Sequence, residues 1–116
     1  MFKILHESEP LGTTLFESGD PEARTVSGAF NNLGGAIALS AWIASNGGTE
    51  DGEAVFIVLN DAFSVTTADG VALDIKEGTL IAVPDEGEAY IEIMLNDEQD
   101  YQQYFPEHIS AATSGA

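Results

Sequence analysis

The side chains best suited to chemistry lie near the end of the chain, where Tyr90 and Glu92 alternate with apolar residues. Side chains two positions apart on a strand share a face, so this phenol and carboxylate can serve one ligand or one proton transfer. If that face points inward, both residues line the mouth of the fold; if it points outward, both are solvated. If the interior of the fold is polar, Glu53 is the second carboxylate expected near these two residues. Trp42 is the aromatic residue expected nearby. These four residues are therefore the candidate ligand-binding residues.

No pattern of residues indicates a catalytic centre, a metal site or a cofactor. The two histidines, His6 and His108, stand at opposite ends of the chain and are predicted to be ordinary surface residues. The loop TEDGE at 49–53 lacks the spaced oxygen donors of a calcium loop, so we predict a solvated turn. The sequence also holds no cysteine, no phosphate loop and no dinucleotide fingerprint. We predict no cofactor, and an enzyme that uses only carboxylates and Tyr90 is the alternative.

The residues from 53 onward indicate β-structure. The runs EAVFIVL, AFSVTT, TLIAV and AYIEIML are rich in β-branched and aromatic residues and are separated by turns that contain glycine. Asp69–Gly70 is a hairpin signal, because glycine supplies the positive φ that such a turn requires. Glu77–Gly78 and the corner Pro84–Gly87 are predicted to be further turns. Strands that recur every roughly 8 to 12 residues are typical of a sandwich or barrel.

The secondary structure of two other segments is predicted from other signals. Residues 35–45, GAIALSAWIAS, have the composition of a helix, yet their alternation and their flanking glycines favour a strand. The segment NDEQDYQQYFPEHIS predicts a short C-terminal helix, with Asn96 or Asp97 as its N-cap and Pro106 at its end.

The spacing of residues from Glu53 onward resembles the cupin superfamily. Glu53 stands at the glutamate position of the family's first motif, six residues follow it, and Asn60 replaces the glycine. Gly78, five residues and Pro84 match the second motif, while Tyr90 occupies the position of its metal-binding histidine. The first motif's two histidine positions hold no histidine either. The resemblance therefore implies a cupin-like framework without the usual metal ligands.

This resemblance implies a mainly β fold, namely a small antiparallel β-barrel or jelly-roll with a short C-terminal helix. The chain is similar to the cupin of the ethanolamine-utilisation system, which also lacks the full histidine set. We expect one cupin-like domain over residues 1–110 and a flexible tail over residues 111–116. The resemblance implies a binding role that needs no metal, and we find no residue that would carry phosphoryl transfer.

The charge of the chain restricts its partners. Twenty acidic residues face three basic ones, which gives a formal net charge of −17. Such a surface repels phosphate backbones and anionic lipids, so we expect no direct binding to nucleic acid or membrane. The acidity suits solubility or salt adaptation, a docking surface for a basic protein, or a mimic of nucleic acid. Because the sequence shows no signal peptide or transmembrane stretch, we expect a cytoplasmic or virion-associated protein.

Three functions follow as hypotheses. The first is a metal-free, cupin-like protein that binds a small ligand or a protein partner without catalysis. The second is an acidic inhibitor or nucleic-acid mimic, of the kind that phages encode, which blocks a basic site on another protein. The third is a structural protein, such as a capsid decoration protein, that associates with copies of itself as a homo-oligomer.

Overall fold

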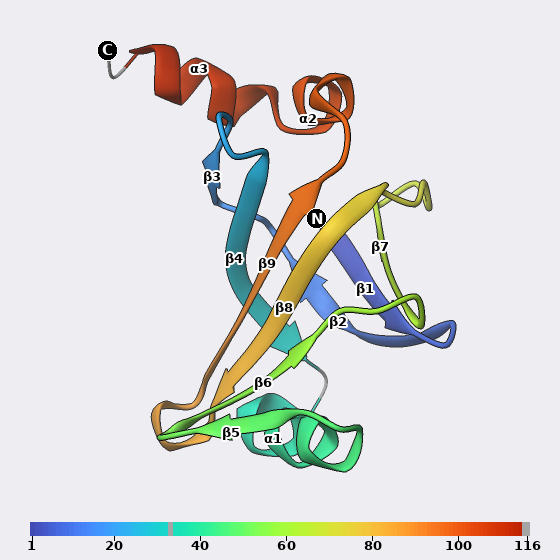
Figure 1. Cartoon of the computed structure of the whole chain (residues 1–116), viewed down its shortest axis with the longest axis vertical. Helices are drawn as coiled ribbons and strands as arrows, with labels where there is room; N and C mark the ends of the chain where they lie inside the picture. The colour runs from blue at the N-terminus through green and yellow to red at the C-terminus, as the bar shows by residue number, and fades with distance from the viewer. Residues whose placement is uncertain (33, 115–116) are drawn as a thin grey trace.

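The computed structural model describes residues 1–32 and 34–114, and β-strands make up most of its regular structure, which confirms the mainly β prediction (Figure 1). The strands are β1 (Phe2–His6), β2 (Glu9–Thr14), β3 (Ser18–Asp20), β4 (Thr25–Asn32), β5 (Thr49–Asp51), β6 (Ala54–Val58), β7 (Phe63–Thr66), β8 (Ile75–Val83) and β9 (Glu88–Leu95). The helices are α1 (Gly35–Ser45), α2 (Glu98–Tyr104), α3 (Pro106–Ser114) and the 3-10 helix η1 (Pro84–Glu86). The long strands β4, β8 and β9 connect the end that carries α1 to the end that carries α2 and α3.

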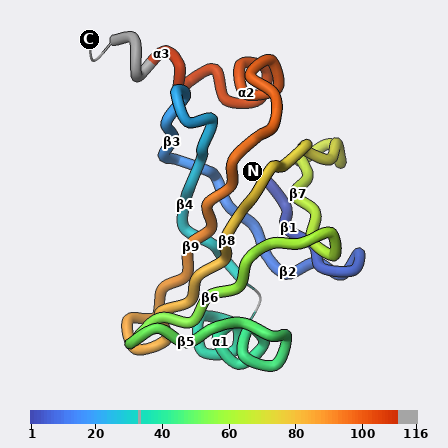
Figure 2. The backbone as a smooth tube through the Cα atoms, in the orientation of Figure 1, coloured from blue at the N-terminus to red at the C-terminus, as the bar shows by residue number. Residues whose placement is uncertain are grey.

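The strands form one curved antiparallel sheet in the order β5-β6-β8-β9-β4-β2-β1-β7, with β3 also paired to β4. The two end strands of this order, β5 and β7, do not pair with each other, so the sheet is open, and the predicted β-barrel or jelly-roll is not shown. The reason lies in the path of the chain. Strand β6, which pairs with β8, ends at Val58, and the chain then crosses so that β7 pairs with β1 (Figure 2). A hollow of about 310 Å³ remains between β7 and the start of β8.

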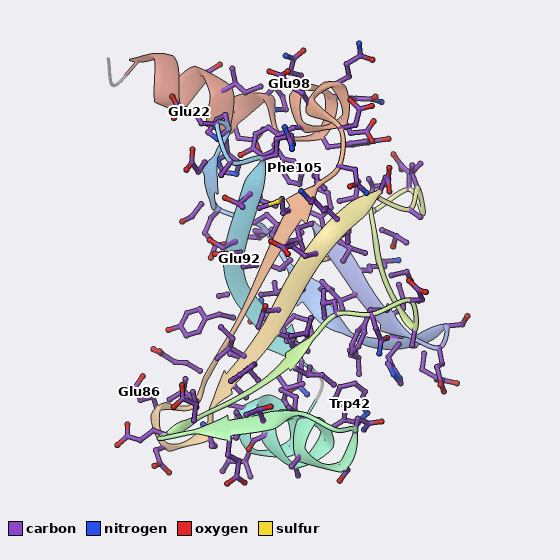
Figure 3. The ribbon with its side chains drawn as sticks, viewed as in Figure 1. Glu22, Trp42, Glu86, Glu92, Glu98 and Phe105 are labelled. Carbon is purple, nitrogen blue, oxygen red and sulfur yellow. The ribbon has the colours of Figure 1, made fainter. Side chains whose placement is uncertain are left out.

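The hydrophobic core lies on the inner face of this sheet. Four alternate residues of β9 are buried there, so the apolar side of the run AYIEIML is the one that faces the core: Ala89, Ile91, Ile93 and Leu95. At the end beneath α2, three phenylalanine rings pack with centroids 5.1 to 5.8 Å apart: Phe2, Phe16 and Phe105. Figure 3 shows Phe105 between the helices and the sheet. Burial of apolar surface on one side thus leaves the other side of β9 facing outward.

Residues 35–45 form helix α1, so the strand predicted there is wrong. The residues of α1 that are buried, Leu39 and Ile43, stand four positions apart and therefore lie on one helical face. The alternation that favoured a strand came largely from alanines, which tolerate either side of a helix. Gly47, at φ 87°, and Gly48, where a Cβ would lie 2.2 Å from Cγ2 of Ile43, then turn the chain back under the helix.

One of the two predicted turns around β8 is confirmed and the other is wrong. The corner at Pro84–Gly87 consists of η1 followed by Gly87 at φ 67°. Glu77–Gly78 instead lies inside β8, next to an irregularity in its pairing with β9. Gly78 is needed for packing rather than for a turn, because a Cβ there would lie 2.8 Å from Cδ1 of Leu59.

The hairpin predicted at Asp69–Gly70 is present, with Gly70 at φ 88°. The backbone N–H of Thr67 donates to the carbonyl of Val71 at 2.9 Å, which closes the turn. The second arm of this hairpin is a single bridge between Thr66 and Ala72 rather than the expected strand.

The C-terminal segment forms two helices where one was predicted. The side chain of Asp97 accepts a backbone hydrogen bond from the first turn of α2 at 2.7 Å, which confirms it as the N-cap. Pro106 follows the end of α2 and begins α3, which is the helical position where proline is best tolerated. Helix α3 extends through residues 111–114, and residues 115–116 lie outside the described part of the chain. The predicted flexible tail at 111–116 therefore stays a prediction.

His108 is buried, so its assignment as a surface histidine is wrong. Its ring stacks on Phe105, and its Nε2 lies 2.7 Å from the carbonyl oxygen of Phe16. Because a carbonyl only accepts hydrogen bonds, Nε2 carries the proton of the bond. His108 therefore anchors α3 to the sheet, which is a structural role.

Candidate functional site

The structure brings together two of the four candidate residues. Tyr90 and Glu92 are exposed on the outward side of β9, whereas Glu53 is exposed in the turn between β5 and β6. Trp42 is half-buried on α1 and packs against His6, with ring centroids 4.9 Å apart. Figure 3 shows Glu92 along β9 and Trp42 at the α1 end. Of the two orientations that the sequence left open, Tyr90 and Glu92 have the outward one.

Tyr90 and Glu92 belong to a surface that four strands build through their register. Tyr90 pairs with Ile81 of β8, Ile81 pairs with Phe56 of β6, and these side chains form one outward row. The next outward row contains Glu92, its partner Thr79 and, beyond that, Val58. On the other side of β9, the two rows continue into β4. We call this surface the outer face, and its residues are Phe56, Val58, Thr79, Ile81, Tyr90, Glu92, Ala29 and Ser27.

The outer face exposes more apolar surface than a solvated sheet face needs. The side chain of Val58 is 59% exposed and that of Tyr90 is 41% exposed, while Phe56 and Ile81 are half-buried. Helix α1 packs through Leu39 and Ile43 into the core and does not cover this row. Contiguous apolar residues that a protein leaves exposed often mark a surface that another molecule covers.

Three hollows follow β9 across the outer face. The first, of about 190 Å³, lies between Glu88, Tyr90 and Ala29. The second, of about 350 Å³, shares Tyr90 with the first and is also lined by Ile81 and Glu92. The third, of about 240 Å³, shares Glu92 with the second and reaches Val58 and Glu77. Because neighbouring hollows share a wall residue, we treat them as one feature, the β9 groove.

Carboxylates stand along the whole β9 groove. The hydroxyl of Tyr90 donates a hydrogen bond to the Glu88 carboxylate. This bond, together with desolvation and the negative charges of Glu88 and Glu86, raises the pKa of Tyr90 above its ordinary value. The phenol is therefore protonated at neutral pH and keeps Glu88 beside its ring. A cation that enters the first hollow meets a carboxylate whose position is already fixed.

A bulge between β2 and β3 supplies another carboxylate to the groove. Thr14 and Ser18 are four positions apart, whereas their partners on β4 are three positions apart, so the chain holds one extra residue there. Phe16 adopts φ 47° in this bulge and points into the core. The carboxylate of Glu17 then accepts the backbone N–H of Ala29 at 3.0 Å, at a point where β4 has no strand partner on that side. The extra residue thus fixes Glu17 at the wall of the second hollow.

Sequence reasoning found the centre of this surface and missed most of it. Phe56, Val58 and Ile81 went unnoticed because residues 54–59 and 80–83 are apolar at every position, so alternation does not show which side is buried. Glu17 went unnoticed because its role depends on a bulge that only the pairing with β4 reveals.

The described residues do not gather the ligands that a metal ion needs. Within residues 1–32 and 34–114, no group of three or more histidine, aspartate or glutamate side chains surrounds one point. The other conspicuous group is the aromatic trio His6, Trp42 and Phe63, whose ring centroids lie 4.8 to 6.0 Å apart. These rings pack edge-on against one another, so we interpret the trio as a packing feature between α1 and the sheet.

No family model, curated protein or solved structure matches the chain. The resemblance to cupins therefore stays a prediction, and the function has to be inferred from the chain's own surface. Among the described helices, none is long and apolar enough to cross a membrane.

Proposed function

We propose that the chain is a non-catalytic binding protein whose outer face docks a basic surface of another protein. The observation that carries this proposal is the apolar part of the outer face, which Tyr90, Ile81 and Val58 form and which Glu88 and Glu92 flank on β9. An apolar centre with a charged rim is the usual anatomy of a protein interface. The apolar row supplies the surface that is buried, and the carboxylates select a partner of opposite charge.

A protein partner fits this surface better than a small ligand does. Small-ligand sites are concave and enclose most of the ligand's surface in one cavity. On the outer face, the hollows of about 190, 350 and 240 Å³ are spread along one strand. A partner that contacts all three must extend across the sheet, as a protein does. The cupin-like ancestry that the sequence suggests is compatible with such a role, because a fold by itself does not fix a function.

A basic partner also fits better than a second copy of the chain. Two copies joined through this face would bring Glu88 and Glu92 of one near the same residues of the other, with −17 net charge on each. Like charges opposed across an interface cost several kcal/mol. A partner rich in lysine and arginine gains from the same carboxylates and associates faster at low salt.

The proposal is tested by cross-linking followed by direct binding. A photo-reactive amino acid at Val58, compared with one at Ile37 on α1, is used to capture proteins in extract from the source cells. The captured protein is then purified and titrated with the unmodified chain. We expect it to be basic and to bind with one-to-one stoichiometry. Its affinity should fall about tenfold or more between roughly 50 and 300 mM salt.

Variants decide whether the binding uses the outer face. Tyr90→Ala should weaken it strongly, since aromatic residues at the centre of an interface contribute most to affinity. Ile37→Ala removes an exposed apolar side chain elsewhere and should leave the affinity unchanged. An acidic or neutral partner, a second copy of the chain, or equal affinities for the two variants would contradict the proposal.

A further inference from the structure

We infer that the segment received by the β9 groove is an extended chain with basic residues four positions apart and an apolar residue midway between them. This inference rests on the proposed function and specifies the partner's shape. The partner segment is defined by its chemistry. Over five consecutive residues, the first and the last are basic, the third is apolar, and the second and the fourth can be of any type. Three neighbouring outward residues on β9, at alternate positions of the strand, set this pattern: Glu88, Tyr90 and Glu92.

The spacing of the two carboxylates sets the conformation of the bound segment. Glu88 and Glu92 are four residues apart on one strand, so their Cα atoms are separated by about 13 Å at roughly 3.3 Å per residue. A second extended chain places its own residues four apart at the same distance, with their side chains on one side. In a helix, side chains four apart are only about 6 Å from each other. An extended segment that lies over β9 therefore reaches both carboxylates with two basic residues four positions apart, whereas a helix with the same spacing does not.

The middle of the groove suits an apolar side chain. The second hollow, of about 350 Å³, is lined by the ring of Tyr90 and by Ile81, and its walls include the small residues Gly28 and Ala29. The Glu17 carboxylate on its wall already accepts the N–H of Ala29. A valine or leucine placed between the two basic residues would cover Tyr90 and Ile81 and remove them from water.

The hollows on either side suit basic side chains. Glu88 borders the first hollow and stays beside Tyr90 through its hydrogen bond. Glu92 borders the third hollow together with Glu77. Lysine and arginine carry long aliphatic stems, so each can lie along the apolar row and still present its charge to a carboxylate. The groove therefore offers basic, apolar and basic positions in that order.

The inference is tested by calorimetric titration of the full chain with three synthetic peptides. The first, Thr-Lys-Thr-Val-Thr-Lys-Thr, has the inferred pattern. The second, Thr-Thr-Lys-Val-Lys-Thr-Thr, has the same composition with the lysines two apart. The third is an alanine-rich, helix-forming peptide with its lysines four apart. We expect the first peptide to bind about tenfold more tightly than the other two, which corresponds to about 1.4 kcal/mol.

Matched variants locate the binding. Tyr90→Ala and Glu92→Gln should each weaken binding of the first peptide at least several-fold. Ile37→Ala and Glu9→Gln remove the same kinds of group from exposed positions elsewhere and should have no effect. Circular dichroism of each variant confirms that the fold is retained.

Each outcome separates this inference from the proposed function. Equal binding of the first two peptides, or tighter binding of the helical one, overturns the extended pattern. If none of the peptides binds while a folded basic partner still binds through Tyr90, the inference fails and the proposed function stands. If neither the peptides nor a basic partner depends on Tyr90, both are wrong.

Discussion

The outer face and the exposed side of α1 are both apolar surfaces, yet the elements that build them differ in the charge of their own residues. Ile37 on α1 is 74% exposed, more than Val58 or Tyr90 on the outer face. Residues 25–49, which include all of α1, contain no charged side chain, whereas Glu88 and Glu92 flank the outer row. Exposed apolar area therefore does not distinguish the two surfaces. The carboxylates do, and they make the outer face selective for cationic partners.

The difference arises from how each element is anchored. Helix α1 is fixed by Leu39 and Ile43, and most of its other positions are alanine or serine, which need neither burial nor charge. The residues of strand β9 have to alternate between apolar and polar, because its inner residues fill the core while its outer residues meet solvent. The outer residues of β9 can therefore be polar or charged without cost to the core, and two of them, Glu88 and Glu92, are acidic.

The largest expected effect is on the free energy of unfolding, and it contrasts the buried and the exposed side of α1. Leu39→Ala should lower the free energy of unfolding by about 2–5 kcal/mol, because it leaves a cavity beneath the helix. Ile37→Ala, two residues away on the exposed side, should change it by less than about 0.5 kcal/mol. Denaturant unfolding measures both values. A large cost for Ile37→Ala would show that another part of the molecule covers that side.

A second prediction concerns the bulge that positions Glu17 at the outer face. A Cβ at Gly28 would lie 2.5 Å from a carboxylate oxygen of Glu17 and 2.8 Å from the hydroxyl of Thr14. Gly28→Ala should therefore displace Glu17 and lower the free energy of unfolding by about 1–3 kcal/mol. Ser27→Ala, the neighbouring substitution, should have little effect. Equal unfolding midpoints for the two variants would contradict this account of the bulge.

A third prediction contrasts the two tyrosines whose pKa is raised. Tyr101 is buried and donates a hydrogen bond to the carbonyl of Thr25 at 2.9 Å. Burial, followed by the charges of Asp20 and Glu107, raises the pKa of Tyr101 to about 12 from an ordinary value of 10.0. Its neutral form is favoured in the folded state, so this stability is fully present below about pH 10 and is lost as the pH rises towards 12.

The measurement for the third prediction is unfolding of the wild type and of Tyr101→Phe between about pH 8 and 12. At pH 8 the variant should be less stable by about 1 kcal/mol, because the hydrogen bond to Thr25 is lost. The difference should shrink as the pH rises above 10. Tyr90→Phe is the control, and its stability should follow that of the wild type because this side chain is exposed. A constant difference between the wild type and Tyr101→Phe would contradict the account.

Sequence reasoning succeeded where a single hydrophobic periodicity, or one residue with a specific conformational preference, determines the local structure. The alternation of AYIEIML separated the two sides of β9 and left open which of them is buried, and Gly87 marked the corner that precedes this strand. Asn96 or Asp97 was predicted as the helix cap because a short polar side chain satisfies the free N–H groups of the first turn, and Asp97 is the residue that does so.

It failed where the structure depends on contacts between distant segments. The alanines in residues 35–45 fit both periods, and only the packing of Leu39 and Ile43 on the sheet selects a helix. Gly78 looks like a turn residue, yet it is small because Leu59 lies over it. The open sheet likewise depends on where the chain crosses after Val58, which no local pattern encodes.

The most direct test of the central claim is to map where the alternating peptide Thr-Lys-Thr-Val-Thr-Lys-Thr contacts the chain. Backbone amide chemical shifts are recorded during one titration at about 50 mM salt, where electrostatic attraction is weakly screened. The account predicts the largest changes in β9 and in the neighbouring parts of β4 and β8 that line the β9 groove, and none in α1. Changes concentrated in α1 around Ile37, or spread evenly over the acidic surface, would contradict it.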